Sequence, residues 1–101
     1  MYIYNVTIKV TPRIEDAWIK WMQETHLDEV VSTGQFDSYH FFELIEPKDD
    51  EGRTFVAQYF TDSEQRYQKY IDEFAPSLRD KGYQLFGNQF IAFRSILKRL
   101  A

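Results

Sequence analysis

Polar side chains that interrupt apolar strands are the residues of this chain best suited to chemistry. These interruptions are Asn5, Thr7, Gln58 and Arg94. The guanidinium group of Arg94 suits the binding of a planar anion, so we predict a clamp for an anionic ligand. His26 falls where two helical segments are predicted to meet, and an imidazole there could serve as acid, base or ligand anchor near neutral pH. Tyr59, beside Gln58, is a further candidate for the lining of a pocket.

Each of these residues also has a purely structural interpretation. His26 could cap the carboxyl end of the helical segment before it, where a positive charge is favoured. Arg94 could form a salt bridge between subunits, because a buried charge needs a partner. His40 lies in an apolar strand, where a single histidine is more often a sheet residue than a ligand.

Several other kinds of site are not indicated by the sequence. Two histidines form no metal centre without added carboxylates, and no His-Glu-x-x-His spacing occurs. The acidic turn at 48–51 lacks the spacing of a calcium loop. Neither a glycine-rich phosphate loop nor a serine nucleophile motif is present. We therefore expect neither a metal nor a cofactor.

Four segments have the pattern of β-strands. Residues 2–10 alternate strictly between two faces, which is typical of a half-buried strand. Residues 36–46 and 53–61 are predicted to pair as a hairpin, because the polar turn at 47–52 separates them. Residues 90–98 form the last predicted strand.

The first predicted helix changes its apolar phase along its length. Thr11 and the proline after it are expected to begin this helix. Trp18 and Trp21 lie on its apolar face and are predicted core residues. Because the later apolar residues fall on the opposite side, we predict a kink at Thr25–His26. The pattern Thr25-x-x-Asp28 would cap a second segment that ends at Gly34.

The second predicted helix has a regular apolar face. It is expected to begin at Asp62 or Ser63, and its apolar residues from Tyr67 onward recur at helical spacing. Pro76 is expected to break or kink it because proline lacks the amide donor. Gly82 is expected to end it.

The order of these elements predicts the fold class. The order β-α-β-β-α-β is the split βαβ arrangement of ferredoxin-like folds. Right-handed, uncrossed connections favour an antiparallel sheet of order 4-1-3-2 with both helices on one face. We therefore predict one α+β domain over residues 1–101. Since strands 1, 3 and 4 are neighbours in this sheet, we expect Asn5, Thr7, Gln58 and Arg94 to cluster on one face.

Composition narrows the function classes further. The 101 residues are 44% hydrophobic and 28% charged, which excludes a disordered chain. No apolar run approaches the roughly 18 residues of a membrane span, no signal peptide pattern is present, and cysteine is absent. We expect a soluble cytoplasmic protein without a membrane partner. The net charge of -4 argues against nucleic acid as a partner.

The aromatic content predicts a second copy as a partner. Nine Phe, seven Tyr and two Trp make up 18% of the chain. Each such side chain buries about 150–250 Å² of surface. A single small core is not expected to bury all eighteen of these aromatic side chains. The sheet face without helices must meet water or another subunit. We expect a homodimer.

Short motifs along almost the whole chain resemble those of the bacterial DUF4286 family. They are Tyr4-Asn5-Val6-Thr7, Trp18-x-x-Trp21-Met22 with His26, Thr33-Gly34-x-Phe36, Val56-Ala57-Gln58-Tyr59, Phe74-Ala75-Pro76-x-Leu78-Arg79, Phe86-Gly87 and Phe90-x-Ala92-Phe93-Arg94. That family is of unknown function and is similar to the dimeric α+β barrel proteins. The resemblance implies two ferredoxin-like sheets paired face to face and a small ligand between sheet and helices. The chain departs from the family after His26, where Leu27-Asp28 replaces Ile-Pro.

Three functions from different classes follow from these patterns. The leading hypothesis is a dimer that binds a small, anionic molecule. A more specific version of this hypothesis is that the dimer is a cofactor-independent enzyme of the monooxygenase-like kind. Its predicted ligand-binding residues are His26, Gln58, Arg94, Asn5 and Tyr59, with His26 as the candidate catalytic group. The alternative is a non-catalytic interaction module whose sheet faces close without a cavity. An RNA-recognition domain shares the element order, but residues 53–59 keep only the Arg and one Phe of its signature.

Overall fold

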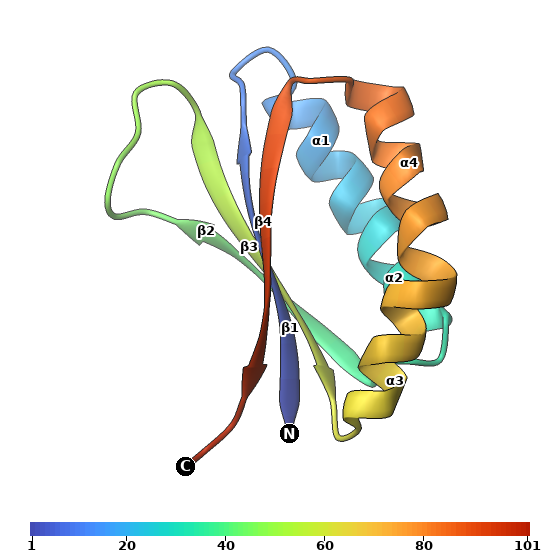
Figure 1. The fold of residues 1–101 in the computed structure, drawn as a ribbon. Helices are drawn as coiled ribbons and strands as arrows, with labels where there is room; N and C mark the ends of the chain where they lie inside the picture. The colour runs from blue at the N-terminus through green and yellow to red at the C-terminus, as the bar shows by residue number, and fades with distance from the viewer.

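The computed structural model describes all of residues 1–101 as a four-stranded antiparallel sheet with helices on one face (Figure 1). The strands are β1 (Tyr2–Val10), β2 (Ser38–Leu44), β3 (Arg53–Thr61) and β4 (Phe90–Lys98). They lie in the order β2-β3-β1-β4. The predicted ferredoxin-like α+β class and sheet order are therefore confirmed. None of the helices has the length and apolar character needed to cross a bilayer.

The first helical connection consists of α1 (Glu15–Trp21), the π-helical turn η1 (Met22–His26) and α2 (Leu27–Ser32). The side chains of Trp18, Met22, Leu27 and Val30 are all buried, and the step from Met22 to Leu27 is five residues. A π turn holds such residues on one face because its hydrogen bonds run from i to i+5. The predicted change of apolar phase is confirmed, and the π turn is its cause.

Two of the predicted caps in this region are wrong. His26 stands directly before α2 with helical φ and ψ angles, and no side chain caps α2. The helix continues through this point, so Thr25 and Asp28 have no free end to cap. Thr11 does not cap α1 either, because α1 begins at Glu15 with Ile14 at its N-cap, and the Thr11 hydroxyl donates to Gln89 Oε1 at 2.9 Å.

The second connection repeats the pattern with α3 (Glu64–Lys69), the π turn η2 (Tyr70–Phe74) and α4 (Ala75–Phe86). Ser63 caps α3, as predicted, because its side chain accepts a hydrogen bond from the Arg66 amide at 3.2 Å. Pro76 lies in the first turn of α4, directly after the π turn, where its fixed φ suits the helix although it has no amide to donate. The irregularity predicted at Pro76 is the π turn that precedes it.

The prediction that Gly82 ends the second helix is wrong. The helix continues to Phe86 and ends at Gly87, whose φ of 57° is one that glycine adopts without strain. Gly82 is buried inside the helix, where a Cβ atom would lie 3.4 Å from the ring of Trp21 and 3.6 Å from that of Phe90. Both distances are ordinary van der Waals contacts, so the packing leaves room for a methyl group at this position.

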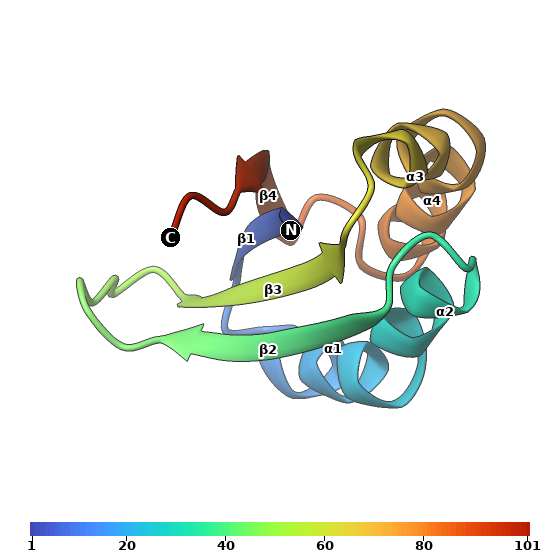
Figure 2. The same ribbon diagram turned by 90° about the horizontal axis from the view of Figure 1, so that it is seen from below.

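The register of the sheet decides which side chains face the helices (Figure 2). Tyr4 pairs with Tyr59 of β3, and Val6 pairs with Arg94 of β4, so these four residues share the helical side. Asn5 pairs with Gln58 and therefore lies on the opposite face. The expected cluster of Asn5, Gln58 and Arg94 on one face is wrong, because Arg94 is one residue out of phase with the other two.

The sheet face without helices carries large apolar side chains. Its exposed members are Phe42, Leu44, Ile91, Phe93 and Leu97. Phe93 is 66% exposed, and Ile91 beside it is 54% exposed. We call these five residues, which belong to the two edge strands β2 and β4, the open-face patch. The buried core lies on the other side, where Trp18, Phe36 and Tyr59 are each at least 98% buried.

Candidate functional site

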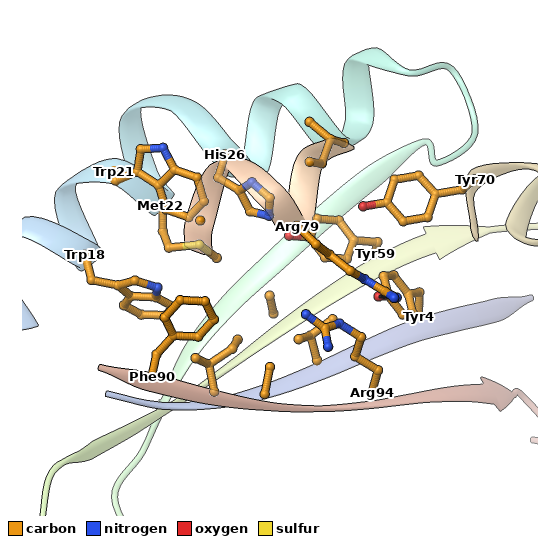
Figure 3. Close-up of a pocket in the computed structure, with 16 residues that line it drawn as sticks. Tyr4, Trp18, Trp21, Met22, His26, Tyr59, Tyr70, Arg79, Phe90 and Arg94 are labelled. Atoms are coloured by element: carbon orange, nitrogen blue, oxygen red, sulfur yellow. Dashed lines mark hydrogen bonds between the residues drawn. The ribbon is translucent and has the colours of Figure 1, made fainter. Parts of the chain in front are cut away.

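A cavity of about 60 Å³ lies between the sheet and the helices (Figure 3). That space is several times the roughly 10–15 Å³ that one water molecule needs. One end is apolar and is walled by Trp18, Trp21, Met22 and Phe90. The other end is polar and is formed by Tyr4, Tyr59, Tyr70, Arg79 and Arg94. The cavity therefore offers an apolar surface that leads to a group of hydrogen-bond donors.

His26 reaches the cavity from the π turn η1 (Figure 3). Its ring stacks on Trp21, with the ring centres 4.5 Å apart and the planes at 23°. The Nδ1 atom is shut off from solvent and has no hydrogen-bond partner. A buried polar atom without a partner is rare in native structures and is often explained by an unseen ligand or water.

The surroundings of His26 keep its imidazole neutral at pH 7. Burial lowers the pKa of His26 from 6.5 to about 4. The negative charge of Glu29 opposes this change, whereas the positive charges of Arg94 and Lys81 add to it. A neutral imidazole has one nitrogen that accepts and one that donates a hydrogen bond, so His26 can do either toward a ligand.

Arg79 projects from α4 into the polar end of the cavity. One of its terminal nitrogens donates to the hydroxyl of Tyr4 at 2.9 Å. Its Nε atom is buried and unpaired, and no carboxylate lies within 4 Å of its nitrogens. The charge of this half-buried guanidinium group is thus uncompensated within the chain.

Arg94 brings a second guanidinium group to the same end from β4 (Figure 3). It forms no ion pair, and as an exposed residue it stands where the cavity meets solvent. No Asp or Glu is among the sixteen residues that line the cavity. Burial raises the pKa of Tyr59 and that of Tyr70, so both hydroxyls stay protonated at pH 7. The polar end therefore carries positive charge and neutral hydroxyl groups, and no negative charge.

The structure brings together three of the five residues predicted for the site. His26, Tyr59 and Arg94 line the cavity. Asn5 and Gln58 do not, because they lie on the open face, where Gln58 Nε2 donates to Asn5 Oδ1 at 3.1 Å. These two amides satisfy each other, which explains why polar residues are tolerated between apolar ones in these strands.

Arg79 is the site residue that the sequence analysis missed. The residues of α4 that face the sheet are Ala75, Leu78, Arg79 and Gly82, at the spacing i, i+3, i+4 and i+7. An arginine in this apolar row is a signal of the same kind as Arg94 in its strand. It was overlooked because the apolar row was followed only as far as Leu78, although the predicted helix contained Arg79.

The other histidine lies outside the cavity. His40 is an exposed residue of β2 on the open face, where its ring packs edge-on against Phe42 and Phe60. No group of three or more Asp, Glu or His side chains is arranged to hold a metal ion.

Solved structures of other proteins share this fold. An EthD-family protein of Bacillus halodurans matches with a TM-score of 0.73 at 10% sequence identity, over 99% of this chain and 100% of that one. A dimeric ferredoxin-like protein from an uncultured marine organism matches with a TM-score of 0.68 at 17% identity, over 100% and 96%. A monooxygenase of Streptomyces coelicolor, solved in complex with nanaomycin D, matches with a TM-score of 0.61 at 16% identity, over 99% and 89%.

Sequence comparison places the chain in a family without an assigned activity. Among curated proteins, none matches its sequence. The model of the domain of unknown function DUF4286 matches residues 1–100. This match confirms the resemblance seen in the motifs, and the chain belongs to the DUF4286 family.

Proposed function

We propose that the protein binds a small, largely apolar molecule with an anionic group in the cavity between sheet and helices. One observation carries this proposal: the guanidinium groups of Arg79 and Arg94 meet at the polar end of a cavity that has no acidic residue. A carboxylate or phenolate would accept hydrogen bonds from both groups and compensate their charge. The monooxygenase neighbour that holds nanaomycin D supports a small ligand in a fold of this kind.

The energetics of the empty site favour such a ligand. A buried donor without a partner costs about 1–3 kcal/mol, and more when the group is charged. Arg79 is such a group, since its Nε atom is buried and unpaired, so the chain gives up stability at this site unless a ligand compensates for it. The apolar end adds affinity because flat rings can pack against Trp21 and Phe90.

Benzoate and benzyl alcohol test the proposal, because they differ in charge and are similar in size. We expect benzoate to raise the melting temperature and benzyl alcohol to have little effect. Replacing either Arg79 or Arg94 by Met should weaken benzoate binding about tenfold or more, since each removes a charge-assisted hydrogen bond. Arg13, which is exposed and makes no ion pair, gives the matched control Arg13→Met. Equal stabilisation by the two probes, or equal loss in all three variants, contradicts the proposal.

A catalytic activity of the monooxygenase kind is a second candidate. It is supported by the neighbour described as a monooxygenase and by His26, a neutral base at the ligand cavity. Dioxygen would be the oxidant, with one oxygen atom entering the substrate and the other leaving as water. For the probe 1-naphthol, C10H8O and O2 would give C10H6O2 and H2O. Oxygen uptake that requires the protein and is lost in His26→Phe supports this activity, and uptake equal to that of buffer contradicts it.

We also propose that two copies of the chain pair through the open-face patch. Exposed apolar patches of this kind mark interfaces in soluble proteins. Two similar structures are described as dimeric ferredoxin-like proteins. The alternative, a non-catalytic interaction module, uses the same face but has no need of the cavity. It predicts a dimer that neither benzoate nor any related acid stabilises.

A further inference from the structure

His26 lines the cavity with an imidazole ring that the proposed anion does not contact. Its Nδ1 atom is buried and unpaired, and the ring is held in place by the stack on Trp21. The charged groups nearest to the imidazole do not provide a hydrogen-bond partner for its nitrogen. Glu29 is bound to Lys81 at 2.7 Å, and Arg94 carries a positive charge that faces the polar end.

The imidazole and the two arginines approach the cavity from different elements. His26 comes from η1, whereas Arg79 comes from α4 and Arg94 from β4, and Figure 3 shows the ring and the guanidinium groups on different sides of the cavity. One carboxylate can compensate the guanidinium groups, and a second polar group is then needed for the imidazole.

We infer that the ligand is a hydroxylated aromatic acid, whose acid group contacts Arg79 and Arg94 and whose hydroxyl group is hydrogen-bonded to the imidazole of His26. This inference rests on the proposed function, because it assumes that an anion occupies the polar end. A hydroxyl group fits the histidine because it both donates and accepts, and so serves either tautomer of the ring. An ammonium group does not fit, since the two guanidinium groups would repel it.

This arrangement predicts selection for the hydroxyl group. When an acid without a hydroxyl group binds, it displaces water from the cavity and gives the imidazole of His26 no hydrogen-bond partner. Sites that are built to hydrogen-bond a hydroxyl group discriminate strongly against analogues that lack it. One unpaired buried group costs enough free energy to change affinity by about tenfold or more. We therefore expect a hydroxy acid whose hydroxyl group reaches His26 to bind more tightly, by this factor, than the same acid without the hydroxyl group.

The test compares benzoate with 2-, 3- and 4-hydroxybenzoate by isothermal titration calorimetry. We expect at least one isomer to bind the wild-type protein about tenfold or more tightly than benzoate. His26→Phe keeps the aromatic stack and removes both nitrogens, so this ratio should fall below about twofold. His26→Gln keeps a hydrogen-bonding amide and should retain part of the preference.

His40→Phe is the matched control, because it removes the other histidine, which lies on the open face. This variant should keep the wild-type ratio. If benzoate binds but no isomer gains affinity, or if the gain persists in His26→Phe, the inference is wrong and the proposed function stands. If neither benzoate nor any hydroxybenzoate binds, the proposed function and the inference both fail.

Discussion

Replacing His26 by Phe separates the packing of the ring from the chemistry of its nitrogens. The phenyl ring can occupy the same place on Trp21, whereas the unpaired Nδ1 atom is lost. We expect the variant to be more stable than the wild-type protein by about 1 kcal/mol at pH 7.5, because an unsatisfied buried polar group costs about 1–3 kcal/mol. If removing the imidazole stabilises the protein, the requirements of folding do not explain why a histidine occupies position 26.

The same substitution should change how stability depends on pH. The pKa of His26 is about 4 in the folded protein and about 6.5 in the unfolded chain. Between these two values the unfolded chain binds the proton that the folded protein does not, so the wild-type protein loses stability as the pH falls below 6.5. Each pKa unit corresponds to about 1.36 kcal/mol, so the whole interval corresponds to about 3 kcal/mol. About 2 kcal/mol of this is lost by pH 5.

Urea unfolding of both proteins between pH 7.5 and pH 5 measures this effect, with the fluorescence of Trp18 and Trp21 as the signal. All carboxylates are common to the two proteins, so the difference in the free energy of unfolding reports His26 alone. We expect that difference to widen by about 2 kcal/mol over the range. Parallel pH curves would refute the reasoning, because they would mean that His26 titrates alike in the folded and unfolded states.

Three further outcomes are expected. Gly82→Ala should stabilise the protein by about 0.5–1 kcal/mol in urea unfolding, because alanine favours the helix and its methyl group meets Trp21 at ordinary contact distance. The same methyl group narrows the cavity, so the affinity of Gly82→Ala for benzoate should be lower than that of the wild-type protein. An unchanged affinity would mean that benzoate binds outside the cavity. Phe93→Lys should convert a dimer into a monomer in light scattering, because it puts a charge into the open-face patch. Ser63→Ala should lower the free energy of unfolding by about 1 kcal/mol, since the amide of Arg66 loses its partner.

The strands and their order could be predicted from the sequence because their pattern has a simple period. The predicted limits 53–61 and 90–98 agree with β3 and β4. The predicted strand 36–46 is shorter in the structure, from Ser38 to Leu44, although β3 runs one residue beyond the paired segment at each end. The residue pattern shows where a strand lies and does not show how far its pairing with a neighbour extends.

The helices show where a fixed helical period misleads. A step of five residues, from Met22 to Leu27 or from Tyr70 to Ala75, breaks the spacing of an α-helix and indicates a π turn when both residues are apolar. We interpreted the first of these steps as a kink, because a change of apolar phase alone does not distinguish a bend from an inserted residue. The π turn is what carries His26 into the cavity.

The composition of the site depends on register, which alternation within one strand does not determine. Asn5 and Gln58 interrupt their strands as Arg94 does, yet only Arg94 faces the helices. The pairing of Val6 with Arg94 fixes this difference, and it results from contacts between strands that are distant in the sequence. Arg79 could have been found from its place in the apolar row of α4, because it follows Ala75 at i+4 within the predicted helix.

The most direct test of the central claim is a crystal structure of the protein with 3-bromobenzoate, whose bromine atom gives an anomalous signal. The account predicts one bromine peak per chain in the cavity, on the side of Trp21 and Phe90, with the carboxylate within hydrogen-bond distance of Arg79 and Arg94. A structure with bromine peaks on the surface alone and an unliganded cavity at saturating probe would contradict it.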